Sequence, residues 1–129
     1  MRVLVDANSL LRAVDQPTLL GSAAASVMGD PGNPLLLSAV TFWEISIKVA
    51  LKNLNLSSPF RPWINQAIAD LGMSILPITV DHADAQIALP MHHRDPFDRL
   101  LVAQARIENL PIVSSDPVLE RYGVTRIWE

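Results

Sequence analysis

Short aliphatic runs alternate along the chain with longer segments in which apolar residues recur at helical spacing. The short runs lack polar alternation, which is typical of strands buried on both faces of a parallel sheet. They predict five strands, the last near a sheet edge, at residues 2–5, 35–37, 74–78, 111–114 and 124–128. Strands that alternate with helices indicate an α/β fold with a mostly parallel sheet and helices on both of its faces.

Capping residues and prolines predict where the helices begin and end. Asp95-Pro96 and Asp116-Pro117 are strong starts, because Asp caps free amide groups and proline gives up only an amide that has no partner. Another helix is expected directly after Asp6, and one through residues 19–28 with Thr18 as its N-cap. Further helices are predicted near residues 39–51, 62–71 and 79–89.

The totals fit one domain over residues 1–129, with a hydrophobic content of 50% and no cysteine. The missing cysteines exclude disulfides, thiolate metal sites and a cysteine nucleophile. A net charge of −3 argues against a nucleic-acid coat, though not against an enzyme that acts on nucleic acid. No apolar run approaches the ~20 residues of a membrane span, so we expect a soluble, cytoplasmic protein. Its mean hydropathy of +0.26 suggests that a partner covers apolar surface.

Four carboxylates are expected at one edge of this sheet. Asp6 ends the first strand, Asp116 follows the fourth, Asp98 lies in the first turn of its helix, and Glu44 lies in the second turn of the helix after the second strand. In open α/β sheets the ligand crevice lies outside the carboxyl ends of the strands. All four side chains can therefore converge there.

Each acid also has a simpler explanation. Helix capping alone would account for Asp6 or Asp116, it fully accounts for Asp95, and the helix dipole favours Asp98. Glu44 is harder to explain, because an i,i+4 pair with Lys48 is a weak reason for an acid in so apolar a helix.

Carboxylates gathered at a buried edge repel one another unless a cation lies between them. A set of oxygen ligands favours Mg²⁺ or Mn²⁺ over Zn²⁺. We expect His92 and His93, which adjoin in a loop, to be solvated rather than to bind metal. Such a cluster suits phosphodiester hydrolysis by metal-activated water.

Four segments together resemble the PIN-domain proteins of the VapC-type toxin group, and the likeness covers nearly all of the chain. They are Val3-Leu4-Val5-Asp6, residues 38–48 with Phe42-Trp43-Glu44, residues 93–105 with Asp95-Pro96-Phe97-Asp98, and Ile112-Val113-Ser114-Ser115-Asp116. The resemblance implies a three-layer α/β/α sandwich with a five-stranded sheet. It also implies a metal-dependent endoribonuclease with RNA as its substrate, the toxin of a toxin-antitoxin pair.

By the resemblance, Asp6, Glu44 and Asp98 match the three central acids of the family and Asp116 matches the fourth. Asp95 matches a position usual in the subgroup but lies outside this core. The chain departs mildly from the family at Ala7 and Ser114, where threonine is frequent. Ser114 is thus a candidate supporting residue. Asn8 is either a supporting polar contact or a helix cap.

Arg94 and Arg99 flank the cluster and could hold RNA phosphates, since arginine presents a planar fork to oxyanions. Solvation, or an ion pair with Asp95 or Glu120, is the alternative for both. Trp43 and Trp63 lie on apolar helical faces and are expected in core or interface packing rather than in base stacking.

The apolar surplus and the resemblance together predict a homodimer and a small antitoxin partner that covers the active-site groove. Two alternatives remain open. In one, the acids are caps and the chain is a non-catalytic domain whose acidic edge binds a basic partner segment. In the other, the same metal chemistry hydrolyses small phosphate esters. Metal-dependent stabilisation would separate the binding domain from the enzymes.

Overall fold

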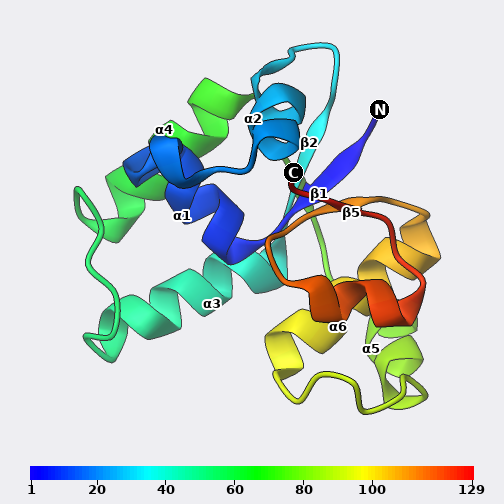
Figure 1. Ribbon diagram of the computed structural model, residues 1–129. Coiled ribbons are helices and arrows are strands. Elements are labelled where there is room, and N and C mark those ends of the chain that lie inside the picture. Colours follow the sequence, from blue (N-terminus) through cyan, green and yellow to red (C-terminus); the bar gives the residue numbers. More distant parts are fainter.

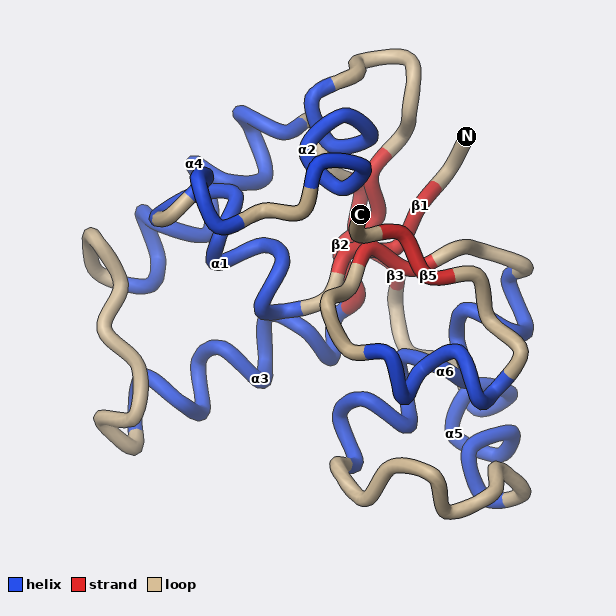
Figure 2. The backbone as a smooth tube through the Cα atoms, viewed as in Figure 1, coloured by secondary structure: helices blue, strands red, loops and turns tan.

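The computed structural model describes residues 1–129 and has a five-stranded sheet at its centre (Figure 2). The strand order is β3-β2-β1-β4-β5, and every neighbouring pair is parallel. The strands are β1 (Val3–Val5), β2 (Leu35–Ser38), β3 (Ser74–Leu76), β4 (Ile112–Val113) and β5 (Arg126–Ile127). The predicted α/β fold is confirmed, with β5 at an edge as expected.

Helices cover both faces of the sheet. They are α1 (Ala7–Asp15), α2 (Ser22–Gly29), α3 (Ala39–Ala50), α4 (Phe60–Leu71), α5 (Val80–Ile87) and α6 (Pro96–Glu108), with 3₁₀ helices η1 (Pro17–Leu19) and η2 (Pro117–Tyr122). Figure 1 shows α1, α2 and α4 grouped apart from α5 and α6. The architecture is therefore the three-layer sandwich that the resemblance implied. No helix is both long enough and apolar enough to cross a membrane.

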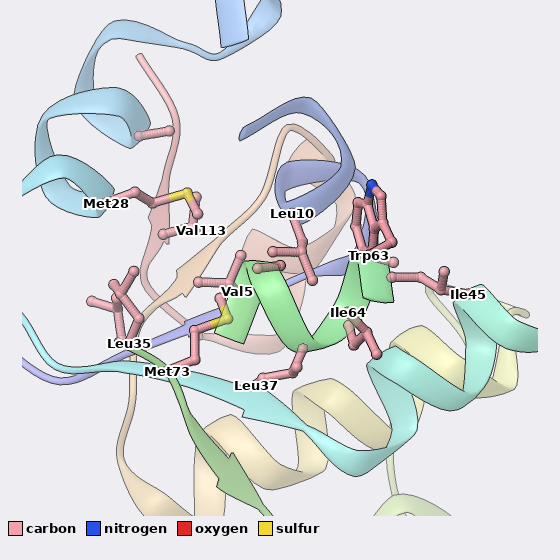
Figure 3. Packing of buried hydrophobic residues seen from close by; sticks show 14 residues of the cluster. Val5, Leu10, Met28, Leu35, Leu37, Ile45, Trp63, Ile64, Met73 and Val113 are labelled. Atoms are coloured by element: carbon pink, nitrogen blue, oxygen red, sulfur yellow. The ribbon is translucent and has the colours of Figure 1, made fainter. Parts of the chain in front are cut away.

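Two apolar clusters fill the spaces between these layers. Val3 and Val5 point into the cluster under α1, α2 and α4, where Leu10, Met28 and Trp63 pack (Figure 3). Leu4, between them in sequence, belongs to the other cluster, with residues of α6 such as Val102. This division follows from the alternation of side chains along a strand. It explains why the strand sequence is apolar at every position.

The helix expected through residues 19–28 with Thr18 as its cap is wrong. Thr18 lies inside η1, and α2 begins only at Ser22, with Gly21 as its N-cap. The segment after β5 packs against this start, where the Trp128 carbonyl accepts the Ala24 N–H at 3.0 Å. A Cβ atom at Gly21 would lie 2.2 Å from that carbonyl oxygen. A close backbone approach between distant segments therefore sets the start of α2.

Candidate active site

Asp6 follows β1 directly and lies at the carboxyl edge of the sheet. It is buried and is the N-cap of α1, where its Oδ1 accepts the Ser9 N–H at 2.9 Å. The Ser9 hydroxyl donates to the carbonyl of Val113 in β4 at 3.1 Å. Burial raises the pKa of Asp6, although hydrogen bonds from Ser114 and Ser9 oppose that rise. Asp6 is thus both a cap and a desolvated carboxylate.

Ser114 links Asp6 to the acid on the neighbouring strand. It is fully buried after β4, and its Oγ accepts the Asp116 N–H at 3.1 Å. Its hydroxyl also lowers the pKa of Asp6 through a side-chain hydrogen bond. Asp116 caps η2 by accepting the Val118 N–H at 3.0 Å, so the predicted cap is present. Because β1 and β4 are neighbours, this one hydroxyl contacts the segments that carry both acids.

Glu44 comes from the second turn of α3 and is also buried. Its Oε2 accepts Lys48 Nζ at 2.7 Å, so the i,i+4 pair considered above exists. Even so, the pKa of Glu44 is raised, because burial outweighs the opposing effect of Lys48. The nearby charges of Asp95 and Asp6 raise it further. Glu44 is therefore electrostatically part of the carboxylate cluster despite its lysine.

Asp98 is the acid most affected by its neighbours. Burial raises its pKa to about 7, and the charges of Asp95, Glu44 and Asp6 act in the same direction, while His93 opposes them. It lies in the first turn of α6, whose N-cap Asp95 accepts the Phe97 N–H at 2.9 Å. Asp98 therefore lies close enough to Asp6 and Glu44 for their charges to raise its pKa.

His93 lies among these acids, which corrects the expectation that it is solvated. Its Nε2 is 2.9 Å from Asp116 Oδ2 and 3.1 Å from Asp98 Oδ2, and ligand atoms of the three residues lie within 4.8 Å of one another. Its Nδ1 accepts the backbone N–H of Asp95 at 3.2 Å. The only local signal was its position two residues before a helix cap. By contrast, His92 is exposed as expected.

Arg99 is buried, and its guanidinium is bound by backbone carbonyls, which argues against the predicted contact with an RNA phosphate. Its guanidinium donates to the carbonyls of Pro90 at 3.0 Å, Gln86 at 2.9 Å and Leu89 at 3.1 Å. These bonds fasten the loop between α5 and α6 to α6. Arg99 is therefore neither solvated nor ion-paired, which were the alternatives to a phosphate contact. Glu120 pairs instead with Arg126, at 3.1 Å.

Arg94 and Asn8 are exposed near the cluster. Arg94 makes no ion pair, so the predicted pairing with Asp95 or Glu120 is absent, and its contact with phosphate stays a prediction. The cap of α1 is Asp6 rather than Asn8. A polar contact from Asn8 likewise stays a prediction.

The two tryptophans differ in environment. Trp63 is buried in the core, and its Nε1 donates to Asp15 Oδ1 at 3.1 Å. Trp43 is 55% exposed and packs edge-on against Phe97 of α6, with ring centroids 5.6 Å apart. Core packing is therefore right for Trp63, whereas Trp43 is free to meet a partner.

The donor set fits a hard divalent cation. Three of its carboxylates have raised pKa values, and the cation paired with one of them is Lys48, on Glu44. A cation would relieve this repulsion, and oxygen donors suit Mg²⁺ or Mn²⁺. The residues present therefore match the predicted kind of ion.

Comparisons with known proteins point to one family. The sequence pattern of the PIN domain matches residues 3–124. No curated protein matches the sequence. Among solved structures, VapBC2 from Rickettsia felis, bound to a promoter DNA fragment, has a TM-score of 0.76 at 12% identity and covers 100% of both chains.

Two further structures have the same fold. FitAcB from Neisseria gonorrhoeae has a TM-score of 0.63 at 19% identity, over 98% of this chain and 96% of its own. VapBC-5 from Mycobacterium tuberculosis, a member of the VapBC family of toxin-antitoxin systems, has a TM-score of 0.61 at 18% identity, over 98% and 97%.

Proposed function

This chain belongs to the PIN-domain family, and from that premise we propose that it is a metal-dependent endoribonuclease, the toxin of a toxin-antitoxin pair. The observation that carries the proposal is the convergence of desolvated carboxylates from β1, α3 and α6 on one edge of the sheet. Solved structures with this fold include a toxin-antitoxin system, which supports the same assignment. A cytoplasmic location is part of the proposal.

Asp6, Glu44, Asp98 and Asp116 would hold Mg²⁺ or Mn²⁺. When bound, such a cation supplies positive charge for the scissile phosphate and lowers the pKa of water. The chain supplies the orientation: Ser9 donates to Asp6, and Ser114 accepts the Asp116 N–H. Exposed Arg94, beside the cluster, is the candidate for a contact with an RNA phosphate.

The proposal predicts RNA cleavage that requires a divalent cation. The purified chain, incubated with a mixed structured RNA, should produce fragments with Mn²⁺ and none after chelation, because the carboxylates alone cannot neutralise the phosphate. Asp6→Asn should lose cleavage and keep its circular dichroism spectrum. The fragments are measured on a denaturing gel.

The same preparation separates the alternatives. Mn²⁺ should raise the melting temperature by an amount that grows with the logarithm of its concentration above the dissociation constant. No cleavage and no stabilisation would favour the non-catalytic binding domain. Hydrolysis of a chromogenic monoester in place of RNA would favour a phosphohydrolase of small esters.

The homodimer belongs to the same proposal and has a candidate surface. Val80, Ala83 and Ile87 lie on one face of α5 at helical spacing, and Val80 is 84% and Ile87 71% exposed. Ala83 and Trp43 line a depression of about 360 Å³ between α3, α5 and α6. A second copy covering this apolar face would remove it from water.

We therefore expect a dimer at micromolar concentration that Val80→Glu shifts to monomer, since the change would bury a charge in the interface. Light scattering after size exclusion measures the mass. Asp81→Asn, on the same helix but off this face, is the control and should stay dimeric. A wild-type monomer across this range would contradict the assignment.

The negative charge of the carboxylate cluster is the reason for proposing an antitoxin partner with a basic segment. A sheet edge that carries several desolvated carboxylates suits a segment with arginine, whose fork pairs with carboxylates. Such a segment would cover the active-site groove and block RNA.

A further inference from the structure

The side of the site between Asp98 and Asp116 is already filled. His93 Nε2 forms a hydrogen bond with Asp116 Oδ2 at 2.9 Å and lies within ion-pair distance of Asp98 Oδ2, at 3.1 Å. The imidazole therefore occupies the position that a cation between these two acids would need.

The other ring nitrogen decides which role the imidazole has. His93 Nδ1 is 3.2 Å from the backbone nitrogen of Asp95, and that amide can only donate, so Nδ1 offers its lone pair. The ring proton is consequently on Nε2, directed at the two carboxylates. A histidine that binds metal has the opposite arrangement, in which the nitrogen away from the metal donates to an acceptor.

The loop that carries the ring is held in place. The backbone N–H of His93 donates to Tyr122 Oη at 2.8 Å, and that hydroxyl donates to the Pro90 carbonyl at 2.8 Å. Arg99 donates to the same carbonyl. The orientation of the imidazole is thus built into the loop and does not depend on the acids alone.

Given the metal-dependent function proposed above, on which this inference rests, we propose that His93 is a positioning residue that closes the Asp98–Asp116 side as an N–H donor. The chain then takes one divalent cation, at Asp6, Glu44 and Asp98, and not two. Asp116, which the proposed function includes among the residues that would hold the cation, serves on this inference to hold His93 instead.

The test counts Mn²⁺ ions bound to the purified full chain, by electron paramagnetic resonance of the free ion during titration. The wild type should bind one. His93→Ala should bind two, because the vacated carboxylates become available. His93→Gln should bind one, since its amide nitrogen can still donate at the position of Nε2. His92→Ala is the matched control in the same loop, where the ring packs on Tyr122 at 5.0 Å, and it should bind one.

If the His93→Ala chain does not fold, the Mn²⁺ affinities of two other variants test the same inference. Asp116→Asn should keep one Mn²⁺ with its dissociation constant within about threefold of wild type, whereas Asp98→Asn should weaken it by about tenfold or more. Two ions on the wild type, or an Asp116→Asn loss equal to that of Asp98→Asn, would overturn the inference. So would spin-echo modulation from a nitrogen bonded to Mn²⁺, which would make His93 a ligand. A wild type that binds no ion would instead overturn the proposed function itself.

Discussion

Replacing Asp98 by Asn should reduce RNA cleavage by about 10³-fold or more and, at the same time, stabilise the metal-free chain. The loss follows from removing an acid that the charges of Asp95, Glu44 and Asp6 all influence. The gain follows because the carboxylate is desolvated and repelled by Asp95, Glu44 and Asp6. Cleavage is measured with Mn²⁺ in excess, and stability by urea unfolding with a chelator.

The gain in stability should depend on pH. The pKa of Asp98 is raised from 3.8 to about 7, so between these values the folded chain holds a proton that the unfolded chain releases. Stability of the wild type therefore falls as pH rises through this window and levels off above about 7. One pKa unit corresponds to about 1.4 kcal/mol, and because neighbouring acids share the cost we expect Asn to recover roughly 2 kcal/mol at pH 8.

Asp84→Asn removes an exposed acid from α5 and is the control for both measurements. It should leave cleavage and the pH dependence of stability unchanged. Full cleavage by Asp98→Asn would remove Asp98 from the site. An unchanged pH dependence would mean that its carboxylate is not desolvated as described.

Replacing Arg99 by Met should destabilise the fold by about 3 kcal/mol. The buried guanidinium donates to the carbonyls of Gln86 in α5 and of Leu89 and Pro90 in the loop after it, and methionine would leave them without these donors. For a chain of this size the melting temperature should fall by about 10 °C. Arg99→Lys should recover less than half of the loss, because an ammonium cannot reproduce the fork.

Arg94→Met is the matched control, since Arg94 is exposed and makes no ion pair. It should change the free energy of unfolding by no more than about 0.5 kcal/mol. Equal effects of the two substitutions would contradict the structural role of Arg99.

The strands and most helix ends were predictable because their signals are local. Asp95 and Asp116 cap the two helices whose starts were predicted from the proline that follows each of them. The place of Asp6 at the carboxyl edge of the sheet was predictable for a similar reason, since a buried strand ends directly before it. The edge of the sheet then followed from topology, because parallel strands place their carboxyl ends together.

His93, Arg99 and the start of α2 could not be predicted because their partners are distant in sequence. His93 meets Asp116, 23 residues away, and Tyr122, 29 residues away. Gly21 is the N-cap of α2 at a point where the carbonyl of Trp128 leaves no room for a Cβ atom. Whether a charged side chain is buried depends on such contacts. Local patterns contain no information about them.

The pairing of β1 with β4 has a consequence for synthesis of the chain. Leu4 is the register partner of Ile112, so the central strand lacks one neighbour until residues 112 and 113 have been made. Asp6 and Asp116, which flank this pairing, are brought together by the same late step. A nascent chain would therefore lack the complete set of four acids until the segment around Asp116 has been made and has folded beside β1.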